Sequence, residues 1–149
     1  MDLKTILAGV ELFEGLTKEE IDKVSAVCKR REYNENDVIA AQNTPGTEMF
    51  IIQEGFVEVS LERKGGSPSK VIVNLGTGQT VGEMSLIDQG LRSATIKAIN
   101  SPTIVQVIAQ ADFEKLCEED NHIGYVVMRN IAADLSFRLR QRHLVDLTG

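Results

Sequence analysis

The segment from Leu75 to Thr95 contains the side chains whose types and spacing could do chemistry. Glu83 offers a carboxylate that can accept a hydrogen bond from a sugar hydroxyl. Arg92, nine residues further on, offers a planar guanidinium that fits a phosphate. Gly82 lets a ligand come close to the backbone, because it has no side chain. An anionic group joined to a hydroxyl-bearing ring is a phosphosugar, so this segment is a candidate phosphosugar site.

The same residues also have an ordinary structural interpretation. Gly76, Gly78 and Gly82 are residue types common in turns, and Glu83 and Arg92 could pair with each other and bind nothing. A short helical turn over residues 83–88 would form an anion site only if its backbone amides faced a cavity. The residue types alone leave both interpretations open.

The elements that must position this segment follow from a change of period along the chain. Up to residue 30 the pattern is helical, and Thr17 and Glu20 form a capping-box pattern. From residue 31 to 109, short β-branched segments alternate with turns rich in Gly and Pro, and Gly65–Ser69 is the expected flexible hairpin tip. Closely spaced short strands of this kind predict an antiparallel β-roll, a jelly-roll-like barrel.

The last forty residues return to helical patterning. Asp112 is expected to cap a short helix, and a longer helix is expected from about Asn121 to Leu147. The apolar residues of the long helix are predicted to share one broad stripe: Val127, Met128, Ile131, Leu135, Leu139 and Leu144. The predicted class is therefore α+β and mainly β, with the β-roll flanked by N-terminal helices and a long C-terminal helix. The chain is expected to be a single domain over residues 1–149, with N-terminal helices over 1–30, the β-roll over 31–109 and C-terminal helices over 110–147.

Composition limits the classes of partner. The 16 basic and 22 acidic side chains give a net charge of −6, which argues against general nucleic-acid binding. No window approaches the ~18 consecutive apolar residues of a membrane span. The few residues after the long helix leave no room for a helix-turn-helix unit. A cytoplasmic protein that binds neither DNA nor membrane is expected.

A metal enzyme on a β-barrel is the main competing class of function. Such a site needs several His and Glu side chains on strands, whereas His122 and His143, the two histidines, both lie in helical segments. Cys28 and Cys117 have no metal-ligand spacing and are expected to be structural thiols. No catalytic triad is suggested by residue order or spacing. We therefore expect no catalysis, no metal and no cofactor.

The candidate segment also resembles a known family. Gly82-Glu83-Met84-Ser85-Leu86, followed by Arg92-Ser93-Ala94-Thr95, resembles the phosphate-binding cassette of the cyclic-nucleotide-binding domain family. That family includes regulatory subunits of cyclic-nucleotide-dependent kinases, gated channels and bacterial regulators of the catabolite activator type. The segments 46–52 and 55–59 are similar to its early hairpin, and 12–16 to its N-terminal segment, so the resemblance covers nearly the whole chain.

The resemblance implies a role for each cassette residue. Glu83 would accept a hydrogen bond from the ribose 2′-hydroxyl, and Arg92 would hold the cyclic phosphate with help from the amides of Ser85 and Ala94. Ser93 would touch the phosphate or the base. The implied ligand-binding residues are Gly82, Glu83, Met84, Ser85, Arg92, Ser93 and Ala94, and the alternating Val71, Val73 and Leu75 would line the base. Val81 and Leu91 depart from the residues usual in the family, an aromatic and a proline, but neither position supplies a ligand contact.

The resemblance also implies a sensor rather than an enzyme. Cyclic AMP or cyclic GMP is the expected ligand, and ligand binding would be relayed through the C-terminal helix to a downstream protein that the sequence does not specify. Arg138 or Arg142 could cover the base as a lid, and the helix is expected to form a homodimer. Because the base-lining residues are apolar, cyclic AMP is favoured over cyclic GMP. Two alternatives stay open: an interaction module with a degenerate pocket, and a regulator of the same fold that senses another small molecule.

Overall fold

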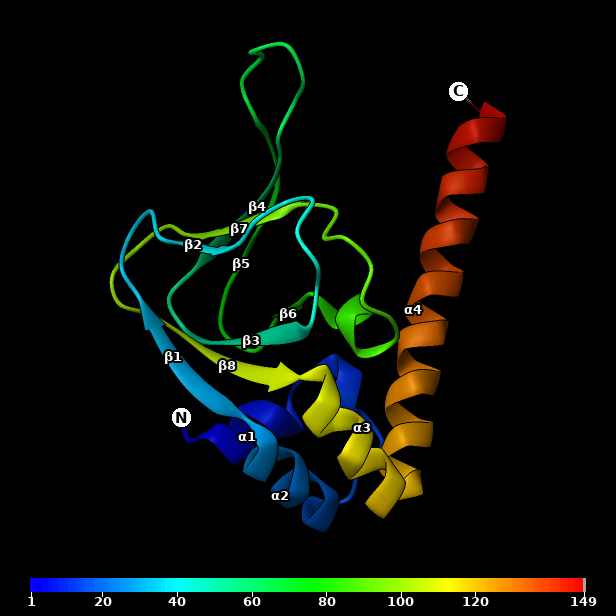
Figure 1. Ribbon diagram of the computed structural model, residues 1–149. Helices are drawn as coiled ribbons and strands as arrows, with labels where there is room; N and C mark the ends of the chain where they lie inside the picture. The colour runs from blue at the N-terminus through cyan, green and yellow to red at the C-terminus, as the bar shows by residue number, and fades with distance from the viewer. Residues whose placement is uncertain (149) are drawn as a thin grey trace.

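The structure, a computed structural model, describes residues 1–148 and the side chains of residues 1–142 (Figure 1). The helices are α1 (Leu3–Ala8), α2 (Lys18–Val27), α3 (Gln110–Glu119) and α4 (Asn121–Thr148), with short 3₁₀ turns at Glu11–Phe13 and Glu83–Leu86. The strands are β1 (Lys29–Tyr33), β2 (Val38–Ala40), β3 (Glu48–Glu54), β4 (Val57–Leu61), β5 (Lys70–Leu75), β6 (Thr80–Val81), β7 (Thr95–Ala98) and β8 (Thr103–Ala109). The predicted fold class is confirmed: antiparallel strands form the middle of the chain, and helices flank them.

The strands form two four-stranded sheets that face each other and do not close into a barrel. The strand orders are β1-β8-β3-β6 and β2-β7-β4-β5, and every pairing is antiparallel. Apolar side chains between the sheets form one core cluster: Phe50, Ile52, Val57, Ile96, Val105 and Val107. Figure 1 shows the hairpin between β4 and β5 projecting from the roll, which agrees with the expected tip at Gly65–Ser69.

The pairing of β4 with β5 contains an irregularity that changes which side chains reach the interior. Val59 pairs with Val73 and Ser60 pairs with Val71, so Ile72 is an extra residue in β5. A bulge of this kind interrupts the strict alternation of side chains along a strand. The prediction that Val71, Val73 and Leu75 share one face is therefore wrong at Val71.

A second core cluster lies between the helices and the first sheet. Figure 1 shows α1, α2 and α3 at one end of the roll, with α4 running alongside it. On α4, Val127 and Ile131 are buried in this cluster, whereas Met128 and Leu139 are exposed. The predicted single stripe of α4 is thus divided between two faces. Leu144 lies outside the described side chains.

Two helix ends differ from the sequence prediction. Helix α2 ends at Val27, and β1 already begins at Lys29, within the range predicted to be helical. The sequence prediction missed this start of β1 because the strand is polar and mostly exposed and shows no alternation of apolar and polar residues. Helix α3 begins at Gln110 with Ala109 at its N-cap, so Asp112 lies in the first turn instead of capping the helix.

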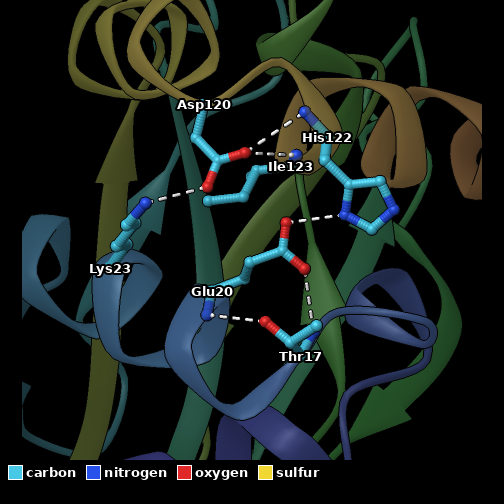
Figure 2. Close-up of polar contacts among 6 residues, drawn as sticks. All are labelled: Thr17, Glu20, Lys23, Asp120, His122 and Ile123. Atoms are coloured by element: carbon cyan, nitrogen blue, oxygen red, sulfur yellow. Dashed lines mark hydrogen bonds and ion pairs between the residues drawn. The ribbon is translucent and has the colours of Figure 1, made fainter.

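A polar network ties α2 to the start of α4 (Figure 2). The predicted capping box is present: the Glu20 amide donates to Thr17 Oγ1 at 3.2 Å, and the Thr17 amide donates to Glu20 Oε1 at 2.9 Å. The other oxygen of Glu20 lies 2.6 Å from His122 Nδ1. Asp120 accepts from the amides of His122 and Ile123 and pairs with Lys23 at 3.0 Å. These contacts fix the first turn of α4 against α2.

Candidate ligand-binding site

The cassette segment borders a cavity of about 590 Å³ that also touches β4, β5, β7 and α4. The lining residues are Val59, Ile72, Val73, Leu75, Thr80, Val81, Gly82, Glu83, Met84, Ser85, Asp88, Gly90, Leu91, Arg92, Ser93, Ala94, Ile96 and Arg138. The structure therefore brings together every residue proposed from the cassette, with Val73 and Leu75 from β5. Val71 and Arg142 are not among the lining residues.

Arg92 is held in place along its whole length. Its Nη2 donates to the backbone carbonyl of Glu48 at 2.8 Å, and its guanidinium carbon lies 5.1 Å from the centre of the Phe50 ring. A Cβ at Gly82 would lie 2.9 Å from Arg92 Nη1, and a Cβ at Gly46 would lie 3.4 Å from Arg92 Cγ. Because neither glycine has a side chain, the Arg92 side chain can occupy the space beside them. The guanidinium is therefore already positioned by the protein itself.

Gly82 meets a second requirement, that of backbone conformation. It precedes the 3₁₀ turn with φ of 81°, in the left-handed region that favours glycine. The turn that follows confirms the short helical turn expected after Gly82. Within it the Ser85 amide already donates to the Gly82 carbonyl at 3.0 Å. A phosphate that used the Ser85 amide would have to share or replace this hydrogen bond.

Glu83 takes a different partner from Arg92, so the two residues do not neutralise each other. Its Oε1 lies 3.5 Å from Nη2 of Arg138, and Arg138 also pairs with Asp134 at 2.9 Å. The Glu83 side chain is mostly buried, whereas that of Arg138 is exposed. Of the two proposed lid residues, Arg138 therefore lies at the cavity.

The wall opposite the cassette is apolar and partly unforeseen. Val59, Ile72 and Ile96 line the cavity beside Val73 and Leu75. Ile72 was missed because the β-bulge cannot be read from the alternation of residue types. Gly46 and Phe50, which position Arg92, were also missed, because their contacts with it join segments about forty residues apart.

Arg92 supplies a partly buried cation at the cavity. Burial lowers the pKa of Arg92 below its ordinary value, and the nearby Glu48 carboxylate acts in the opposite direction. Arginine has an ordinary pKa above 12, so Arg92 stays cationic at neutral pH. A partly buried cation beside an apolar wall gains more from a bound phosphate than a fully hydrated one would.

Three further observations concern metal ligands, the cysteine thiols and helix length. Among them no three side chains of His, Cys, Asp or Glu are grouped as a metal site would require. Burial raises the pKa of Cys28 to about 12, and its thiol donates to the Val24 carbonyl, as a structural thiol would. Within residues 1–148, no helix is both long and apolar enough to span a membrane.

Comparison with known proteins supports the resemblance. The sequence model described as "Cyclic nucleotide-binding domain" matches residues 30–120. The chain is 31% identical over 138 residues to the "Cyclic AMP receptor protein" of Thermus thermophilus, covering 93% of this chain and 61% of that protein. It is 37% identical over 92 residues to a "cAMP-dependent protein kinase regulatory subunit" of Mycosarcoma maydis, covering 62% of this chain and 17% of that protein.

The fold has a match among solved structures as well. The crystal structure of the Thermus thermophilus catabolite activator protein superposes with a TM-score of 0.80 at 32% identity, covering 92% of this chain and 62% of that chain. The chain thus spans at most 62% of the length of these three relatives.

Proposed function

The chain belongs to the cyclic nucleotide-binding domain family, and from this premise we propose that its cavity binds cyclic AMP or cyclic GMP and that the protein acts as a sensor, not an enzyme. One observation carries the proposal: Glu83 and Arg92 line the same cavity opposite an apolar wall, and neither neutralises the other. This arrangement suits a ligand with one anionic group, one free hydroxyl and a flat base. A 3′,5′-cyclic nucleotide has all three.

The role of each group follows from its chemistry. The guanidinium of Arg92 holds the cyclic phosphate through charge-assisted hydrogen bonds. The carboxylate of Glu83 accepts a hydrogen bond from the 2′-hydroxyl, which is the ribose hydroxyl that the cyclic phosphate leaves free. Ile72, Val73 and Leu75 contact the base. The amides of Ser85 and Ala94 and the hydroxyl of Ser93 complete the contacts to the phosphate.

We propose that α4 relays ligand binding. Its residue Arg138 pairs with Glu83, so the ribose site and the helix share one carboxylate. A ligand that bonds to Glu83 changes the partners available to Arg138, and Arg138 in turn can cover the base as a lid.

A homodimer through α4 is part of the same proposal. Tyr125, Met128, Ala132 and Leu139 are exposed, and their spacing of three, four and seven residues is that of a coiled-coil seam. Tyr125 is 60% and Leu139 57% exposed, so a partner copy could bury much apolar surface here. We propose a cytoplasmic location for this dimer.

Direct titration tests the proposal. Purified protein is titrated against fluorescent cyclic AMP and fluorescent cyclic GMP, and each probe is then displaced with its unlabelled form. The linear nucleotide 5′-AMP is the control, because its phosphate is a dianion in a different position relative to the ribose hydroxyls. Saturable binding that cyclic nucleotides displace and 5′-AMP does not displace is expected. Lack of binding of both cyclic nucleotides would favour the interaction module or a different small ligand.

A further inference from the structure

Glu48 contacts two arginines from different parts of the chain, one through its side chain and one through its backbone. Arg31 of β1 holds the Glu48 carboxylate with both guanidinium nitrogens, at 3.1 and 2.6 Å. The backbone carbonyl of the same Glu48 accepts from Arg92 at 2.8 Å. Strand β8 lies between β1 and β3 in the sheet, so the side chain of Arg31 reaches across β8 to Glu48. One residue of β3 thus connects an outer strand with the cavity arginine.

The charge of Glu48 acts on the cavity. Burial lowers the pKa of Arg92, and the Glu48 carboxylate opposes this shift, because it stabilises the Arg92 cation electrostatically. The same carboxylate must repel an anionic phosphate bound at Arg92, because both are negative. Without a second cation beside its carboxylate, Glu48 would compete with the phosphate for Arg92. Arg31 supplies that cation and makes two hydrogen bonds to the carboxylate.

Given the proposed function, on which this inference rests, we propose that Arg31 is a positioning residue for phosphate recognition. Its ion pair neutralises Glu48 and holds the carboxylate with two hydrogen bonds, so that the charge of Arg92 is available to the cyclic phosphate. Arg31 lies outside the cassette and does not line the cavity. Its effect on affinity acts entirely through Glu48.

A double-mutant cycle tests the inference in the titration with fluorescent cyclic AMP. Arg31→Gln leaves Glu48 without its cation, and we expect affinity to fall about fivefold at low salt. Glu48→Gln removes the carboxylate but keeps the backbone carbonyl that holds Arg92, so its affinity should equal or exceed that of the wild type. The double variant, Arg31→Gln with Glu48→Gln, should bind like Glu48→Gln alone.

The double variant separates electrostatics from simple structural support. It lacks the ion pair just as Arg31→Gln does, so a purely structural role predicts that its affinity falls at least as far. Recovery of affinity in the double variant therefore supports the proposal, and continued weak binding overturns it. Because Arg31 and Glu48 are partly exposed, the effect of Arg31→Gln should shrink when NaCl is raised to about 0.5 M.

Controls keep the outcomes distinct. Lys4→Gln breaks an exposed ion pair with Asp22 far from the cavity, and its affinity should match that of the wild type. Arg31→Lys keeps the positive charge, so its affinity should stay close to that of the wild type. If Arg31→Gln folds poorly, Arg31→Lys and Glu48→Gln still test whether charge at these two positions sets the affinity. Wild-type affinity in Arg31→Gln would overturn the inference alone. Failure of the wild-type protein to bind any cyclic nucleotide would overturn the proposed function instead.

Discussion

Arg138 and Glu83 lie where two cavities meet. Together with Leu75 and Thr80, both residues line the 590 Å³ cavity and a second one of about 890 Å³ between α4, the N-terminal segment and the turn before β6. Their closest atoms are 3.5 Å apart, and Arg138 is exposed, so the pair itself contributes little to stability. Its position is what matters, because it makes α4 part of the ribose site.

Substitution of Arg138 should therefore weaken the response of α4 to the ligand more than it weakens ligand binding. In the wild type, cyclic nucleotide should change the rate of amide hydrogen exchange over residues 130–142. In Arg138→Gln this change should become much smaller, while affinity falls no more than about fivefold, because the ion pair with Glu83 and the lid contact with the base are both exposed and weak. Arg129→Gln, on the same helix but hydrogen-bonded to Tyr125, is the control. Exchange in wild-type α4 that does not respond to ligand would contradict the relay.

Substitution of Arg92 should abolish binding and leave the fold intact. Arg92→Leu removes the cation that holds the phosphate, a loss of at least about a hundredfold in affinity. Within the fold it removes one hydrogen bond to the Glu48 carbonyl and one contact with the Phe50 ring, and the leucine can still cover that ring. Glu83→Ala should weaken binding less, because its partner is a neutral hydroxyl. Titration measures affinity, and circular dichroism checks the fold. Arg63→Leu, on the exposed hairpin, is the matched control.

Much of this site could be predicted from the sequence, because its polar part is local. Gly82, Glu83 and Arg92 lie within eleven residues, and Gly82 begins the short turn that carries Glu83. The capping box at Thr17 and Glu20 was also predictable, since both partners lie in one helical turn.

The remainder depends on contacts between distant segments. The bulge at Ile72 arises from the pairing of two strands, and no residue type in β5 marks it. The division of the α4 stripe depends on where α2 and α3 pack, which helical periodicity cannot show. The polar strand β1 lacked any alternation, yet it provides Arg31, which holds Glu48.

The Glu20 carboxylate should stabilise the fold at neutral pH and lose this effect in acid. Burial raises the pKa of Glu20, but hydrogen bonds with Thr17 and His122 outweigh it and hold the pKa below its ordinary value of about 4.3. A carboxyl with a lowered folded-state pKa stabilises the fold above its unfolded-state pKa, and this stabilisation is lost as pH falls through the folded-state value. Glu20→Gln should lower the free energy of unfolding by about 1–2 kcal/mol at pH 7.

The difference between wild type and Glu20→Gln should then narrow below about pH 4. Urea denaturation at pH 3 to 7 measures it. Glu19→Gln, an exposed neighbour in the same helical turn, should leave the free energy of unfolding nearly unchanged at every pH. An equal destabilisation at pH 3 and pH 7 would show that the carboxylate's charge is not the stabilising factor.

The exposed face of α4 should carry the homodimer. Leu139→Glu places a charge in the proposed seam and should convert a dimer into a monomer, because burying an unpaired carboxylate is costly. Met128→Glu should have the same effect nearer the start of the helix. Arg140→Glu, which also adds negative charge to exposed α4, is the control outside the seam. Light scattering gives the mass, and a wild-type monomer with and without ligand would rule out the dimer.

Base selectivity should favour cyclic AMP over cyclic GMP. Guanine has a 2-amino group that needs an acceptor, whereas Ile72, Val73 and Leu75 offer none, so a buried guanine would leave polar groups unpaired. We expect a preference of about 1–2 kcal/mol for cyclic AMP.

Ser93, an exposed hydroxyl at the cavity, is the cassette side chain that could reverse this preference. If Ser93 serves the phosphate, Ser93→Ala weakens binding of both nucleotides equally, because both carry the same phosphate. If it reads guanine, only cyclic GMP is weakened. A wild-type preference for cyclic GMP that Ser93→Ala reverses would overturn the adenine selectivity.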